Sequence, residues 1–245
     1  MTTTNVIAIH QPNYCPWLGY FFKIYASDVF VFLDDVQFAK EGLTKRTFIR
    51  KNAQQCEKRY LTIPVKKSLL QTDIVDVEID FKRDWVQLHL ENLRQIYRHA
   101  PYFDDYFPFV STLLLSANQY DKLADFNINC VQQIADLLHL KTVFYRSSEL
   151  AVQGAKFEYI KGLIDHFDAT TYLSGTGARS YNEDVYFEKT GKQLIYNAFF
   201  PFLENQKYLQ QQGDFLNGLS ILDALFNVGV EGIRELFVEN EKKIF

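Results

Sequence analysis

The N-terminal segment constrains the fold more than any other part of the chain. Two short apolar runs, Val6–His10 and Val29–Leu33, flank a helix-like segment, Leu18–Ser27. A strand, a helix and a second strand within about 30 residues are typical of a βαβ unit in a parallel sheet. Because both runs are continuously apolar rather than alternating, we expect other elements to cover both faces of that sheet.

The same rhythm returns later in the chain. Apolar runs predict strands at 142–145, 170–173 and 194–197, with a helix at 157–167. Helical periodicity is expected over 84–99, 106–116 and 123–140, and over 220–226 and 231–239, divided by Gly229. Further strands are expected at 59–65 and 75–79. We therefore predict one α/β domain spanning 1–245, with a parallel-sheet, Rossmann-like core, a helical insert at about 82–140 and C-terminal helices.

The loop after the first strand is the leading candidate for a binding site. It concentrates Pro and Gly, which restrict the backbone, with aromatic rings and hydrogen-bonding side chains. Ligands of α/β proteins often bind where strands end at their carboxyl side. The alternative is a rigid connector in which Trp17 and Tyr20 anchor the core. The candidate contact residues are His10, Gln11, Asn13, Tyr14, Trp17, Gly19 and Tyr20.

A second loop, Ser174–Arg179, follows the strand expected at 170–173. Backbone amides and hydroxyls of Ser174, Gly175 and Thr176 could cradle an anion, and Arg179 could pair with a phosphate or carboxylate. The alternative is a tight glycine turn with a serine cap on the next helix. In a parallel sheet both loops would open on the same edge.

A third group follows the second strand. Asp34 and Asp35 could hold a metal, orient an amine or act as a base, with Gln37 beside them. Arg46 and Arg50, in a basic stretch at 45–52, could neutralise a diphosphate. The alternatives are loop solvation or helix capping for the acids, and an exposed charged face for the basic stretch. Both interpretations of each stay open.

Composition excludes some classes of protein and favours others. The formal net charge is −4, so no global basic field favours nucleic acid as a partner. Three widely spaced cysteines fit reduced thiols in the cytoplasm better than a disulfide scaffold. We expect no secretory signal, because the N-terminal residues 1–5 hold no basic region and no long apolar run. We expect no transmembrane segment, because no apolar run reaches about 18 residues. The 22 Phe and 15 Tyr predict thick aromatic packing.

Several motifs, in the same order along the chain, resemble those of the WbqC-like protein family. The family's opening motif is matched here by His10–Tyr14 together with Pro16–Tyr20. Its later motifs are matched by Leu33–Phe38, Tyr172–Ala178 and Leu219–Asp223. The family is associated with bacterial surface polysaccharide gene clusters, for O-antigen lipopolysaccharide and capsule. The resemblance therefore implies a bacterial protein that takes part in surface polysaccharide biosynthesis.

A fainter resemblance concerns the fold and its chemistry. The N-terminal segment resembles the start of nucleotidyltransferase-like α/β proteins, such as pantothenate synthetases. The resemblance lies in the order of a strand, a His/Pro-rich loop, a glycine, a helix and a second strand. Those enzymes stabilise the charge of an ATP phosphate with histidines and backbone amides. Tyr20 stands where their first motif has a second histidine, and a tyrosine carries no positive charge at neutral pH.

Together these features lead to a first hypothesis: an enzyme that attaches an acyl or aminoacyl group to the amine of a nucleotide-linked sugar. His10 would bind phosphate or relay a proton, and Asp34 or Asp35 would hold or deprotonate the amine. Transfer could use ATP with Mg²⁺ to activate the acyl group, or a preactivated donor, and both routes stay open. The alternatives are a nucleotidyltransferase that activates a sugar, and a non-catalytic binding protein in a glycan assembly complex.

Overall fold

The structure is a computed structural model that describes residues 5–52, 56–67, 71–175, 183–210 and 214–244. Its centre is a five-stranded sheet in the order β5-β2-β1-β6-β7, in which every neighbouring pair is parallel. The predicted α/β parallel-sheet core is thereby confirmed. The five strands are β1 (Val6–His10), β2 (Val29–Phe32), β5 (Val143–Arg146), β6 (Thr171–Ser174) and β7 (Gln193–Tyr196).

The strand order places a topological switch point between β1 and β6. From β1 the chain first builds outward through β2 to β5, and it then returns to add β6 and β7 on the other side of β1. This is the order of the first five strands in a Rossmann fold. The loops after β1 and β6 leave the sheet in opposite directions, so a crevice is expected at their carboxyl ends.

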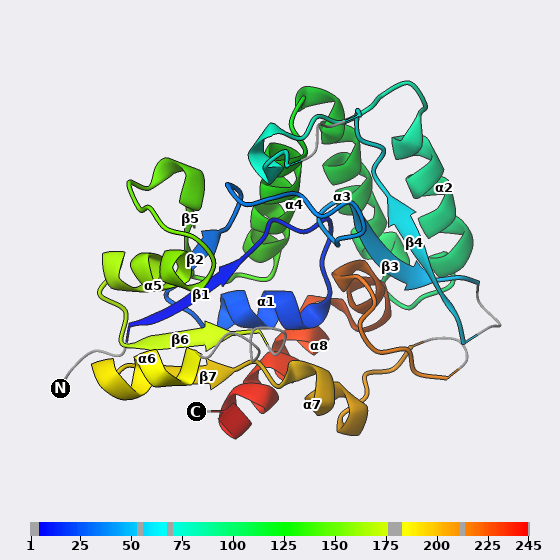
Figure 1. The fold of residues 1–245 in the computed structure, drawn as a ribbon. Helices are drawn as coiled ribbons and strands as arrows, with labels where there is room; N and C mark the ends of the chain where they lie inside the picture. Colours follow the sequence, from blue (N-terminus) through cyan, green and yellow to red (C-terminus); the bar gives the residue numbers. More distant parts are fainter. Residues whose placement is uncertain (1–4, 53–55, 68–70, 176–182, 211–213, 245) are drawn as a thin grey trace.

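Helices cover both faces of the sheet, as the continuously apolar strands predict (Figure 1). Side chains alternate along β1: Ile7 and Ile9 pack with helices α5 (Phe157–His166) and α6 (Glu183–Thr190). Ala8 belongs to the larger core, to which α1 (Leu18–Tyr25), α7 (Phe199–Asn205) and α8 (Ile221–Ile244) contribute among other helices. The sequence predicted α1 and α5 but neither α6 nor α7.

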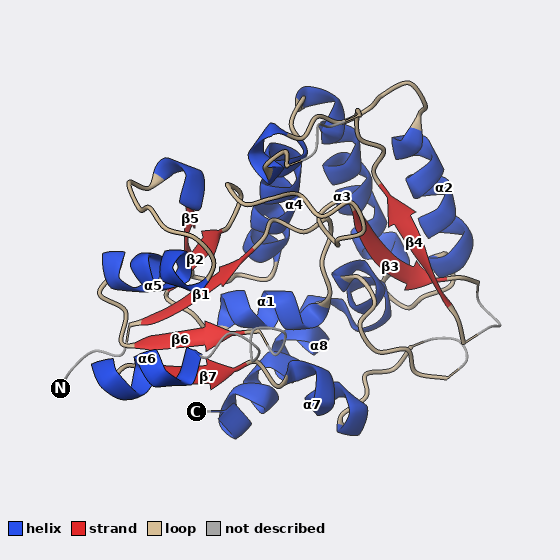
Figure 2. Cartoon of the chain, in the orientation of Figure 1, coloured by secondary structure: helices blue, strands red, loops and turns tan. Residues whose placement is uncertain are grey.

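Three α-helices form a helical segment that directly precedes β5 in the chain, and a small antiparallel hairpin packs beside it. The helices are α2 (Trp85–Tyr97), α3 (Phe103–Leu115) and α4 (Leu123–Leu137), within the stretch where helices were expected. Figure 2 shows the antiparallel hairpin of β3 (Arg46–Arg50) and β4 (Lys58–Thr62) set apart from the main sheet, next to α2. The Arg59 guanidinium donates a hydrogen bond of 2.9 Å to Asn92 of α2, which ties the hairpin to these helices.

Three local expectations can be compared with the structure. The strand expected at 75–79 is wrong, because Ile74–Asp76 forms a single 3-10 turn. The division of the C-terminal helix at Gly229 is confirmed: its φ of 66° and ψ of −174° interrupt α8. Within the described residues, none of the helices has the length and apolar character that crossing a membrane requires.

Candidate active site

A cavity of about 640 Å³ lies at the carboxyl ends of the central strands. Residues that end β1 and β6 border it, as the strand order leads one to expect. The start of α5 forms another wall, and one buried lysine of α1 reaches in. The lining residues are Ile9, His10, Gln11, Lys23, Leu33, Val36, Lys156, Phe157, Tyr159, Ile160, Tyr172, Ser174 and Gly175.

His10, the last residue of β1, has a fixed tautomer. Its Nδ1 lies 3.2 Å from the carbonyl oxygen of Gln11, which can only accept, so Nδ1 carries the proton. Nε2 is then the hydrogen-bond acceptor of the ring. Burial and the positive charge of Lys23 lower the pKa of His10 to about 3. At neutral pH the imidazole is therefore uncharged and can accept a hydrogen bond.

Lys23 is a site residue that the sequence analysis missed. Its side chain is buried within α1, and Nζ donates a 3.0 Å hydrogen bond to the carbonyl of Ile9. The signal was present, because Lys23 is the one charged residue in an otherwise apolar and aromatic helix, Leu18–Tyr25. A buried cation beside a cavity is expensive unless it has partners, and it attracts anionic ligands.

The opening loop divides into residues that face cavities and residues that anchor the loop. Trp17, Gly19 and Tyr20 line a smaller cavity of about 240 Å³ that adjoins the first one. Asn13 and Tyr14 line neither cavity and are buried, and the Tyr14 hydroxyl lies 3.0 Å from Nδ1 of His89 in the helical segment. The alternative made Trp17 and Tyr20 the core anchors: Tyr20 is buried in the core although it also lines the smaller cavity, and Trp17 is partly buried against that core.

Contacts from distant segments hold the anchored part of the loop. The amide of Asn127 on α4 donates to the carbonyl of Pro12 at 2.8 Å. The hydroxyls of Thr47 and Ser220 both donate to the carbonyl of Cys15, at 2.9 and 2.7 Å. Ser220 belongs to the motif Leu219–Asp223, which includes the start of α8, and this motif positions the loop and does not line the cavity.

The second predicted loop reaches the same cavity. Ser174 is buried at the end of β6, and a Cβ on Gly175 would meet nothing within 4 Å, as expected where the backbone borders open space. Both residues line the cavity together with His10. The remaining predicted anion-binding residues, Thr176 and Arg179, lie outside the described residues.

Asp34 is not placed at the cavity wall. It is fully buried and accepts hydrogen bonds from Arg146, at 2.8 Å, and from the backbone and hydroxyl of Ser148, at 3.0 and 2.9 Å. Asp35 accepts a hydrogen bond from the hydroxyl of Tyr159, whose ring does line the cavity. The contacts of Asp34 are those of a structural ion pair, and Asp35 reaches the site through Tyr159.

The third predicted group is dispersed over the structure. Gln37 is exposed and pairs with Asp73 in an isolated bridge. Arg46 forms an ion pair with Glu41 at 2.7 Å on the hairpin. Arg50 is buried and donates to the side chain of Gln210 at 2.7 Å. All three predicted residues lie outside both cavities.

The donor set can be tested against a bound Mg²⁺, the ion that an ATP-dependent route would bring. Magnesium in nucleotide sites is usually held by one or two carboxylates as well as the phosphates. Among the residues described, no acidic side chain lines either cavity, and no group of three or more His, Cys, Asp or Glu could hold a metal. The described residues that line the two cavities therefore lack the carboxylates with which a protein would hold Mg²⁺.

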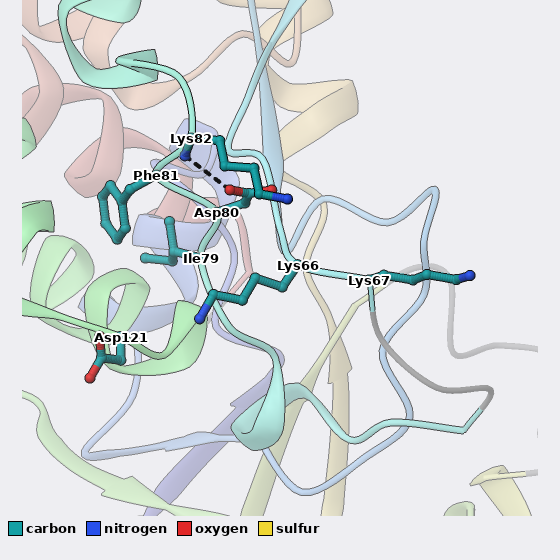
Figure 3. A pocket seen from close by; sticks show the side chains of 7 residues that line it. All are labelled: Lys66, Lys67, Ile79, Asp80, Phe81, Lys82 and Asp121. Atoms are coloured by element: carbon teal, nitrogen blue, oxygen red, sulfur yellow. Dashed lines mark hydrogen bonds between the residues drawn. The ribbon is translucent and has the colours of Figure 1, made fainter.

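A further hollow of about 560 Å³ lies away from the sheet, on the segment after β4 (Figure 3). Lys66, Lys67 and Lys82 border it together with Asp80 and other residues. Charges of both signs lie there: Lys66 forms an ion pair with Glu78 at 2.8 Å, and Asp80 and Asp121 line the hollow beside the lysines. Opposite charges on an exposed face are typical of ordinary surface, so the strand-end cavities are the better candidate.

Comparison with known proteins gives a family match and a sequence relative. The family model described as the WbqC-like protein family matches residues 11–235. An uncharacterized protein of Mycobacterium tuberculosis, Rv1507c, is 31% identical over 226 residues, covering 92% of this chain and 94% of the mycobacterial one. No solved structure matches the chain. The match spans nearly all of the fold and both cavity-bordering loops, and the chain therefore belongs to the WbqC-like protein family.

Proposed function

We propose that the protein is a cytoplasmic enzyme of bacterial surface polysaccharide biosynthesis. It would attach an acyl or aminoacyl group to the amino group of a nucleotide-linked sugar. The observation that carries the proposal is the cavity at the switch point, with a neutral His10 and a buried Lys23 side by side. The sugar-linked part of the proposal comes from the family's association with surface polysaccharide genes.

Position, size and charge support a nucleotide-linked ligand in the larger cavity. Nucleotides bind in the crevice at the switch point of Rossmann-type sheets. A volume of about 640 Å³ lies within the range of small-molecule sites, roughly 300–1,000 Å³. Phe157, Ile160 and Tyr172 offer apolar surface for a ring, and Lys23 supplies positive charge for a phosphate.

His10 is suited to orient the amine during amide formation. With a pKa of about 3 its imidazole is a weak base, so Nε2 accepts a hydrogen bond from the amine and aims the lone pair of the amine at the acyl carbon. The amine that has attacked the acyl carbon carries a positive charge, and it loses its proton to water. The new bond joins the amine nitrogen to the acyl carbon, and the leaving group of the activated donor departs with its electron pair. In this proposal His10, rather than Asp34, orients the attacking amine.

One contact argues against the nucleotidyltransferase alternative. The Tyr20 hydroxyl, which stands where that superfamily has its second histidine, donates a 3.0 Å hydrogen bond to the carbonyl of Gln11. Its proton is thus directed to the backbone of the loop and not to a phosphate. Tyr20 here supports the shape of the loop.

The proposal is tested by thermal shift with UDP- and dTDP-linked amino sugars, the same sugars without an amine, ATP, CTP and acyl-CoA. Each ligand is used with and without Mg²⁺. We expect amino-sugar nucleotides to raise the melting temperature by mass action. Lys23→Met should abolish that rise, whereas the matched control Lys82→Met, at the distant hollow, should retain it.

Mass spectrometry then identifies the reaction product. A sugar nucleotide that gains the mass of the acyl group supports the proposal. Release of pyrophosphate from a nucleoside triphosphate without an amine acceptor would instead identify a nucleotidyltransferase. Failure of every nucleotide to bind at millimolar concentration would favour a binding protein of a glycan assembly complex.

A further inference from the structure

Three residues line both strand-end cavities and form the partition between them. The larger cavity of about 640 Å³ and the smaller one of about 240 Å³ share His10, Lys23 and Gly175. A ligand in either cavity can therefore approach the imidazole of His10 and the ammonium of Lys23. Ligands that occupied both cavities together would meet at these side chains.

The two cavities differ in the size of ligand that they can hold. Small-molecule sites usually measure roughly 300–1,000 Å³, a range that includes the larger cavity and excludes the smaller one. A cavity of about 150 Å³ is large enough for benzene. The smaller cavity therefore has room for a compact group of a few atoms more than benzene, and none for a sugar nucleotide.

Three aromatic rings line the smaller cavity. Trp17 and Phe200 meet edge to face, with ring centroids 5.8 Å apart, and Tyr20 adds a third ring. The amide of Asn197 already donates to the carbonyl of Gly19 at 2.7 Å and accepts from the backbone amide of Phe199 at 3.0 Å. The contact surface offered to a ligand is divided almost equally between polar and apolar atoms, so it suits a group with one polar and one apolar end.

The charge at the partition is positive. Lys23 is buried, and its charge contributes to the lowered pKa of His10. No acidic side chain is found among the described residues that line the smaller cavity. A ligand oxygen with negative or partial negative charge is attracted to this end, whereas an ammonium group is repelled.

We propose that the smaller cavity is a second binding site, for the carboxylate or acyl group of a small carboxylic acid. The acyl or carboxylate oxygen lies toward Lys23, and the carbon chain packs against Trp17 and Phe200. The inference rests on the proposed function in one respect, because it makes this group the partner of the amine held in the larger cavity.

The test compares two Phe→Ala variants, one in each cavity. Phe200 lines only the smaller cavity and is 45% exposed, so Phe200→Ala should fold. Phe157 lines only the larger cavity, and Phe157→Ala is the matched control. The probes are acetate, butyrate, benzoate and a bulky carboxylate, naphthoate, with uridine diphosphate as the probe of the larger cavity. Binding is measured by calorimetry and by Trp17 fluorescence in a Trp85→Phe background.

We expect benzoate or butyrate to bind and to change the fluorescence of Trp17, and naphthoate to bind far less. Phe200→Ala should weaken carboxylate binding about tenfold, the loss expected for one aromatic contact, and leave uridine diphosphate unaffected. Phe157→Ala should do the reverse. Carboxylate binding that only Phe157→Ala weakens, or no carboxylate binding at tens of millimolar, would overturn the inference.

The two proposals fail in different ways. If no nucleotide binds the larger cavity while carboxylates bind the smaller one, the proposed function fails and the second site stands. If nucleotides bind but carboxylates do not, the second site fails and the proposed function keeps its support. Benzoate and uridine diphosphate that bind together, without competition, would support both sites in one experiment.

Discussion

Replacing Asp34 by Asn separates a structural role from a catalytic one. Asp34 is fully buried at the end of β2, and its Oδ2 accepts from two nitrogens of the Arg146 guanidinium, both at 2.8 Å. The Ser147 and Ser148 hydroxyls and the Ser148 amide add further hydrogen bonds. Asn keeps the shape of the side chain, removes its charge and turns an amide group toward these donors.

The expected loss follows from these contacts. Removal of one partner from a buried ion pair costs about 3–5 kcal/mol. Arg146 keeps Asp125 at 2.7 Å, and its side chain is 24% exposed, so the lower end of about 3 kcal/mol applies. For a chain of this size each kcal/mol lowers the melting temperature by about 2–4 °C, so a decrease of about 6–12 °C is expected.

Calorimetry at pH 7 measures the change, in a double-mutant cycle with Arg146→Met. The two substitutions should be strongly non-additive, because each removes the same ion pair. Sugar-nucleotide affinity, measured well below the melting temperature, should stay within a few fold of the unmodified protein. An Asp34→Asn protein that melts at the original temperature but has lost its activity would refute the reasoning and restore the catalytic role.

Three further outcomes are expected. The free energy of unfolding should fall as pH drops from about 6.5 toward 4, since burial lowers the pKa of His10 to about 3 and of His89 to about 4, and the unfolded chain takes up protons first. His10→Gln and His89→Gln should each reduce this loss in urea unfolding; an unchanged pH dependence would contradict it. Gly229→Ala should cost at least about 1 kcal/mol in thermal melting, because φ is 66° and a Cβ would lie 3.0 Å from the Tyr102 ring. Iodoacetamide should modify Cys56 alone in the folded protein, because the other two cysteines are buried, and peptide mapping that finds a second site would contradict this.

The central sheet was predictable because each strand carries its own signal. Buried parallel strands need a continuously apolar run, so β1 and β2 can be recognised without knowledge of their neighbours. The polar and glycine-rich residues after β1 and β6 likewise mark the strand ends locally. The parallel arrangement then brings both loops to one edge of the sheet, where His10 and Ser174 line the same cavity.

One strand of the hairpin was predicted, since a strand was expected at 59–65 and β4 spans Lys58–Thr62, but β3 was not. In β3, Thr47 and Ile49 are buried and alternate with other residues, but the two arginines at its ends were interpreted as ligands for a diphosphate. Arg46 and Arg50 find partners on Glu41 and Gln210 instead. The partner of Arg50 becomes known only from the folded chain, since Gln210 lies 160 residues away in sequence.

The opening loop shows why a dense motif cannot be divided into site and scaffold from sequence alone. His10 and Tyr14 are four positions apart and chemically similar as candidates, yet His10 borders both cavities and Tyr14 is fully buried. What separates them is the path of the chain: Cys15 adopts a φ of 35°, and hydroxyls from β3 and from the residue before α8 fix its carbonyl. A loop that must hold an imidazole at a fixed tautomer has to be rigid, and these distant contacts supply the rigidity. The anchors are therefore as much a requirement of the proposed chemistry as His10 itself, although they touch neither cavity.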